Sequence, residues 1–114
     1  MEGDKIKKIL KEYTEKLKSV YKDKLEKVIL FGSYARGDYT ADSDIDIMII
    51  LADDEDGMRK KEDELASVTF DFDMAYDVYI QPVTQIVNIF NYWQKVHPLY
   101  QDICKEGVVL YDAA

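Results

Sequence analysis

Several residue types are scarce in this 114-residue sequence, and each scarcity excludes a class of protein. Cys104 is the only cysteine, so the chain cannot form an internal disulfide or offer a second thiol as a redox partner. His97 is the only histidine, which excludes a zinc site built from several histidines. We expect Cys104 to be a small core residue. We expect His97, which precedes Pro98, to lie at a helix boundary.

Long apolar runs are also missing. No stretch reaches the roughly 18 apolar residues that a membrane-spanning helix needs, and 33% of the residues are charged. The N-terminus, Met1-Glu2-Gly3-Asp4-Lys5, is charged and lacks the apolar centre of a signal peptide. The sequence therefore predicts one globular domain over residues 1–114, located in the cytoplasm and not bound to a membrane.

Positive charge is in short supply. The chain has 15 Lys and Arg against 23 Asp and Glu, a formal net charge of -8. Direct binding to a long nucleic acid is therefore not expected, because two polyanions repel each other. A single nucleotide needs only local compensation, which metal ions held by aspartates, with Arg36 nearby, would supply.

The chain is organised around residues 31–51. An apolar run, Val28–Phe31, ends in the pair Gly32-Ser33, a turn that lets backbone N–H groups approach an anion such as phosphate. Asp44 and Asp46 then begin an Ile-rich segment. On a strand they would share one face, with Cα atoms about 7 Å apart. Unpaired charge beside a core is costly, so this pair favours a bound divalent cation such as Mg²⁺.

Gly32-Ser33, ten residues, then Asp44-Ile45-Asp46 resembles the signature of the nucleotidyltransferase superfamily typified by DNA polymerase beta. Phe31 and Ala35-Arg36-Gly37 sharpen the resemblance to its smallest branch, the minimal nucleotidyltransferase (MNT) proteins. The resemblance implies an α/β (α+β) fold, in which helices flank a small mixed sheet of about four strands.

The flanking segments predict regular elements. Apolar residues recur at helical spacing from Asp4 to Tyr21, Lys27–Phe31 reads as a first strand, and Asp44–Leu51 reads as a second. Ser33 is expected to cap a short helical turn that runs to Arg36, or to contact phosphate. Residues 57–76 fit either a helix or, from Val68 onward, a strand; we favour the helix. The acidic run 53–56 is read as a solvated helix N-terminus.

A third strand is expected at Asp77–Gln81. The resemblance requires a third acidic residue on the strand beside the aspartate pair, and Asp77 is the candidate, with Asp71 and Asp73 as rivals that would face solvent on a helix. After Pro82, apolar residues from Ile86 to Val96 predict a helix that either packs on the core or presents Phe90 and Trp93 to a partner. A last helix from Pro98 and a strand at Val108–Tyr111 complete the chain.

The resemblance implies transfer of AMP from ATP to a hydroxyl, with two Mg²⁺ ions as cofactors. Asp44, Asp46 and Asp77 would be the catalytic metal ligands, and Gly32, Ser33, Arg36 and Ser43 would bind the nucleotide; an ion pair of Arg36 with Asp38 or Asp42 is the structural alternative. The usual partner of this branch is a HEPN-family toxin, which the MNT protein neutralises as an antitoxin.

Three functions remain open: an antitoxin that adenylylates its partner, a transferase for a small molecule such as an aminoglycoside, and a non-catalytic subunit that inhibits by contact. A homo-oligomer is also left open. The intact set of aspartates argues against the non-catalytic subunit.

Overall fold

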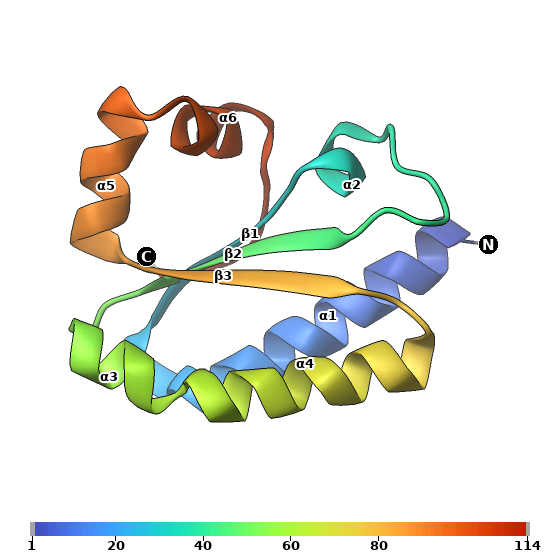
Figure 1. The fold of residues 1–114 in the computed structure, drawn as a ribbon, viewed down its shortest axis with the longest axis horizontal. Helices are drawn as coiled ribbons and strands as arrows, with labels where there is room; N and C mark the ends of the chain where they lie inside the picture. The colour runs from blue at the N-terminus through green and yellow to red at the C-terminus, as the bar shows by residue number, and fades with distance from the viewer. Residues whose placement is uncertain (1, 114) are drawn as a thin grey trace.

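The computed structural model describes residues 2–113, which form a four-stranded sheet with helices on both faces (Figure 1). No helix within these residues is long and apolar enough to cross a bilayer. The elements in chain order are α1 (Glu2–Tyr21), a 3-10 turn (Lys22–Lys24), β1 (Leu25–Phe31), α2 (Ser33–Arg36), β2 (Ile45–Leu51), α3 (Glu55–Lys60), α4 (Glu62–Tyr76), β3 (Ile80–Ile86), α5 (Val87–Val96), α6 (Pro98–Glu106) and β4 (Val108–Asp112).

The strands lie in the order β3-β2-β1-β4. β1 is antiparallel to both β2 and β4, whereas β2 and β3 are parallel and are joined by the α3–α4 crossover. β4 and β3 are therefore the edge strands. The mixed sheet flanked by helices confirms the expected fold class.

Side-chain alternation along β2 separates two apolar layers. Ile45, Ile47 and Ile49 pack in the larger core with α1 and α4, whereas Met48 and Ile50 pack in a smaller core with α5 and α6. Figure 1 shows α1 and α4 on one side of the sheet and α5 and α6 on the other. Asp46 has the same parity as Met48 and Ile50, so it belongs to the α5–α6 face.

Tyr13 joins α1 to α4 in the larger core. It is fully buried, its hydroxyl is hydrogen-bonded to Thr69 Oγ1 at 2.8 Å, and its ring meets Phe72 edge to face at 5.3 Å. Burial raises the pKa of Tyr13 to about 12, while the bond to Thr69 acts in the opposite direction. The hydroxyl therefore stays protonated at neutral pH and gives the α1–α4 contact a directional bond.

Residues 57–76 are helical, as predicted, but they form two helices rather than one continuous helix. α3 begins after Asp54, whose carboxylate accepts from Gly57 N, and ends before Lys61, where α4 starts. The acidic run 53–56 is thus a helix N-terminus, in agreement with the sequence analysis.

The third strand differs from its predicted position. β3 starts at Ile80 and continues through Pro82 to Ile86, so the predicted helix begins only at Val87. Proline lacks an N–H donor but is tolerated on an edge strand, because such a strand pairs on one side only. The prediction that the strand ends before Pro82 and that a helix follows it was therefore wrong in its boundaries.

Of the predictions for His97 and Cys104, one is confirmed and one is wrong. His97 lies between α5 and α6, where its Nδ1 accepts from Leu99 N at 3.2 Å, which confirms the helix boundary. Cys104 is exposed and donates to Gln94 Oε1, so its assignment to the core was wrong. α6 buries the neighbouring Ile103, whereas the Cys104 thiol faces Gln94 of α5.

Candidate active site

The turn after β1 brings Gly32 against the carboxylate of Asp46. Gly32 has φ 75° and ψ -154°, a conformation that favours glycine, and a Cβ at this position would lie 2.3 Å from Asp46 Oδ2. Phe31 pairs with Asp46 across the β1–β2 ladder, which fixes this proximity. Position 32 therefore requires glycine for two reasons: the backbone conformation of the turn, and the lack of space for a side chain beside Asp46.

Ser33 is the first residue of α2, whereas Gly32 occupies the N-cap position without a side-chain hydrogen bond. The Gly32 carbonyl accepts from Ala35 N and Arg36 N, both at 3.1 Å. The expectation that Ser33 caps this turn was wrong, because the chain enters the helix one residue earlier. Its alternative role, contact with phosphate, stays a prediction.

The two aspartates of the motif lie at the start of β2. Asp46 is half-buried and Asp44 is exposed just before the strand. Burial raises the pKa of Asp46, the negative charge of Asp44 raises it further, and Arg36 acts in the opposite direction. Neighbouring oxygen ligands whose charge is only partly compensated fit a divalent cation, which would relieve both the burial cost and the repulsion.

Arg36 projects from α2 between two acidic partners. Its Nε donates to Asp38 Oδ2 at 3.2 Å, and its Nη1 lies 3.7 Å from Glu106 Oε2 at the end of α6. The hydrogen bond with Asp38 is the main reason that the pKa of Arg36 is raised. The predicted alternative with Asp38 is therefore observed. Because Arg36 is exposed, both ion pairs are weak enough to be exchanged for a phosphate.

Ser43 shapes the loop that leads to the aspartates. Its Oγ accepts from Thr40 N at 2.8 Å and lies 3.3 Å from Thr40 Oγ1. This side chain thus closes the turn 40–43 and sets the entry into β2. Its predicted contact with the nucleotide remains a prediction.

The structure does not place Asp77 on the strand beside the aspartate pair. Asp77 is the exposed C-cap of α4, with φ 53° and ψ 52°, three residues before β3 begins. The position that pairs with Asp46 on β3 is Gln81. Neighbours in register on adjacent strands project to the same face, so Gln81 is the side chain next to Asp46. If the start of β3 had been known, the alternation of side chains along a strand would have identified Gln81 as the neighbour of Asp46.

The rival carboxylates also have clear positions. Asp71 is exposed, as expected for a helical position, but Asp73 is half-buried and its Oδ1 accepts from Ile80 N at 2.9 Å. Asp73 therefore fixes the start of β3 rather than facing solvent. Within residues 2–113, no three His, Cys, Asp or Glu side chains gather closely enough to hold a metal ion. The acidic site consists of the pair Asp44 and Asp46.

A cavity of about 470 Å³ adjoins Asp44 on the α1 side of the loop 39–44, and Asp46 does not line it. Ser43, Asp44 and Asp77 line it, together with Tyr34 and Tyr39. The two tyrosine rings are stacked, with centroids 4.2 Å apart. Asp44 and Asp77 thus share a cavity wall, although Asp77 is not a sheet neighbour of Asp46.

Comparison with known proteins agrees with this geometry. The nucleotidyltransferase domain family matches residues 4–103. A candidate protein adenylyltransferase of Methanocaldococcus jannaschii is 38% identical over 105 residues, which cover 91% of this chain and 96% of the relative. Another from the same organism is 39% identical over 75 residues, 66% of this chain and 74% of the relative.

Solved structures have the same fold. A crystal structure of a toxin-antitoxin with AMP-PNP is 28% identical, with a TM-score of 0.56 and coverage of 90% of this chain and 73% of that one. A crystal structure of a candidate nucleotidyltransferase from Sulfolobus solfataricus is 22% identical, with a TM-score of 0.55 and coverage of 93% of this chain and 79% of that one, and it shows the fold alone. With its glycine turn packed against Asp46, the chain belongs to the nucleotidyltransferase domain family.

Proposed function

We propose that this nucleotidyltransferase moves AMP from ATP to a hydroxyl side chain of a partner protein, and that the partner is a HEPN-family toxin, which it thereby neutralises. The observation that carries the proposal is the contact of the Gly32 turn with Asp46, because it joins a phosphate-binding type of turn to a cation-binding type of carboxylate pair. The relatives named as protein adenylyltransferases support a protein as the acceptor.

In the proposed reaction an acceptor hydroxyl oxygen attacks the α-phosphorus of ATP. A new O–P bond forms, the bond from the α-phosphorus to the bridging oxygen breaks, and pyrophosphate leaves with that electron pair. Gly32 and Ser33 hold the outer phosphates through the turn, and Arg36 exchanges its surface ion pairs for a phosphate oxygen. Asp44 and Asp46 would hold Mg²⁺, which would neutralise negative charge on the phosphates during the displacement.

Gln81 takes the strand position that the sequence analysis assigned to a third carboxylate. An amide can orient a hydroxyl or a bound water through its oxygen, but it is a far poorer proton acceptor than a carboxylate. The acceptor proton is therefore released to solvent. We propose Gln81 as a positioning residue and Asp77 as a wall of the acceptor cavity.

The test incubates the chain and its partner with ATP and Mg²⁺ and measures the mass of the intact partner. A gain in units of AMP that disappears in Asp44→Asn/Asp46→Asn is the expected result. Gln81→Asp should raise the rate and Gln81→Ala should lower it, whereas Asp77→Asn should leave nucleotide affinity unchanged. A reversed result, with turnover dependent on Asp77 and indifferent to position 81, would restore Asp77 as the third carboxylate.

A second function, inhibition of the partner by contact alone, is favoured by one observation. The acidic site within residues 2–113 is a pair, without the third acidic side chain that the family resemblance implies. If the partner gains no mass and is still inhibited by Asp44→Asn/Asp46→Asn, contact is the mechanism and AMP transfer is excluded.

A further inference from the structure

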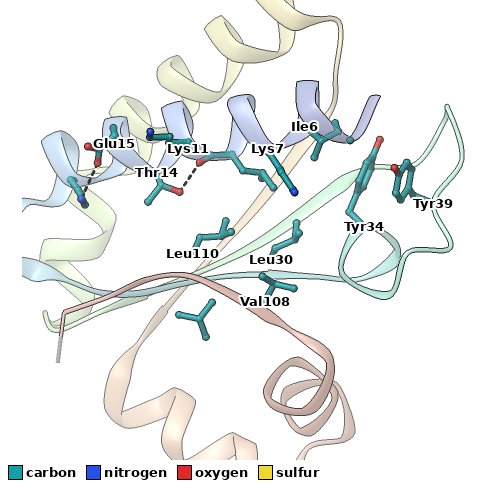
Figure 2. A pocket seen from close by; sticks show the side chains of 14 residues that line it. Ile6, Lys7, Lys11, Thr14, Glu15, Leu30, Tyr34, Tyr39, Val108 and Leu110 are labelled. Carbon is teal, nitrogen blue, oxygen red and sulfur yellow. Dashed lines mark hydrogen bonds and ion pairs between the residues drawn. The ribbon is translucent and has the colours of Figure 1, made fainter. Parts of the chain in front are cut away.

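A second, larger cavity runs between α1 and the edge strand β4 (Figure 2). Its volume is about 600 Å³, and its floor is formed by apolar side chains of both elements and of β1: Ile6, Leu10, Leu30, Val108 and Leu110. We call this cavity the α1–β4 groove. Within residues 2–113 the sheet pairs β4 with β1 on one side only, so the opposite side of the strand carries backbone N–H and C=O groups without a neighbouring strand.

The rim of the groove is basic although the chain as a whole is acidic. Lys7, Lys11 and Lys18 of α1 line it, and the one acidic side chain among the described lining residues, Glu15, is paired with Lys18 at 2.9 Å. The local charge is therefore positive on a chain whose formal net charge is -8. A partner that fits both floor and rim carries apolar and acidic side chains.

The groove leads to the cavity beside Asp44. Ile6, Tyr34 and Tyr39 line both spaces, and Figure 2 shows the two tyrosines at one end of the groove, beyond Ile6. Their stacked rings thus stand between the groove and the wall that contains Asp44. A chain that follows β4 along the groove is directed towards that wall.

We propose that the α1–β4 groove binds an extended segment of the acceptor protein, with alternating apolar and acidic side chains, as an added strand beside β4. Apolar side chains of the segment enter the groove, acidic ones face Lys7 and Lys11, and the backbone bonds to the open edge of β4. This inference rests on the proposed function, since it supplies the acceptor orientation that the transfer requires. A second copy of this chain fits less well, because a two-fold contact would place lysines against lysines.

The test uses two fluorescent eight-residue peptides, one alternating Val and Glu and one alternating Val and Lys, and measures fluorescence anisotropy at low salt. The unaltered chain should bind the Glu peptide more tightly, and added salt should weaken this binding. Lys7→Glu/Lys11→Glu should reverse the preference, with a change of at least about tenfold in the affinity ratio, because two attractions become two repulsions. The matched control, Lys8→Glu/Lys16→Glu, changes the same charge on the same helix away from the groove.

The outcomes separate the groove from the reaction. Binding that responds to Lys7 and Lys11 but not to Lys8 and Lys16 supports the groove even if no AMP transfer occurs, in which case only the proposed function fails. Equal binding of both peptides, absence of binding, or an equal effect of the control would overturn the inference. A concentration-dependent dimer in light scattering that Val109→Lys abolishes would assign the groove to a second copy and would also overturn it.

Discussion

Gly32→Ala should destabilise the chain and disable the active site together. At φ 75° and ψ -154° the added side chain is strained, which costs about 1–3 kcal/mol. The new Cβ would also lie 2.3 Å from Asp46 Oδ2, so the carboxylate must move, and overpacking of this kind costs about 1–3 kcal/mol more. We expect a total loss of about 2–6 kcal/mol.

Gly37→Ala is the matched control for backbone strain. Gly37 also has a positive φ, 85°, but a Cβ there would meet nothing within 4 Å. The expected loss is therefore about 1 kcal/mol, from the left-handed conformation alone. Nucleotide binding should be unaffected, because no side chain near the aspartates has to move.

A double-mutant cycle isolates the contact between Gly32 and Asp46. In an Asp46→Ala background the nearest remaining Asp46 atom, Cβ, lies 3.4 Å from the new methyl group, which is ordinary van der Waals contact. Gly32→Ala should then cost only the backbone strain, so the coupling free energy should be about 1–3 kcal/mol. Urea unfolding gives the stabilities, and calorimetry with Mg-ATP gives the affinities. A coupling near zero would refute the close packing of the turn on the aspartate.

Three further predictions concern individual side chains. Asp46→Asn should stabilise the free chain by about 1 kcal/mol in thermal unfolding while abolishing Mg-ATP binding, because the charges of Asp44 and Asp46 repel each other. At about 7 Å, the Cα spacing of residues two apart in an extended chain, this repulsion is about 0.6 kcal/mol in water and more at a partly buried site. Exposed Asp71→Asn is the control, and a destabilised variant that still binds Mg-ATP would contradict this prediction. The pKa of Asp46 is raised in the folded chain, so the ionised carboxylate destabilises the fold at neutral pH, and this destabilisation falls as pH drops through the folded pKa. The stability gained by Asp46→Asn should therefore shrink as pH falls towards about 4. A gain that is constant with pH would rule out ionisation of Asp46 as its cause. Tyr13→Phe should cost about 1 kcal/mol in urea unfolding through the lost bond to Thr69, and an unchanged midpoint would show that the bond contributes nothing.

The sequence by itself determined the elements whose signals are local. The 3.6-residue period of α1, the apolar run of β1 and the turn at Gly32 depend on neighbouring residues only, and all three were predicted. The motif Gly32-Ser33 with Asp44 and Asp46 was likewise readable, because each half combines a turn or a strand with a chemical group. The same residues predicted the family to which the chain belongs.

Only the tertiary structure decided which side chains meet across strands. Asp77 and Gln81 are both close to the predicted third strand in sequence, but the β2–β3 register pairs Asp46 with Gln81 and leaves Asp77 at the end of α4. Pro82 was read as the end of the strand, because a central strand does not tolerate proline, but β3 is an edge strand, which does. The groove beside β4 was equally invisible, since it depends on how α1 crosses an edge strand almost 90 residues further along the chain. Local periodicity carries no information about such long-range pairings, which are set by packing of the whole sheet.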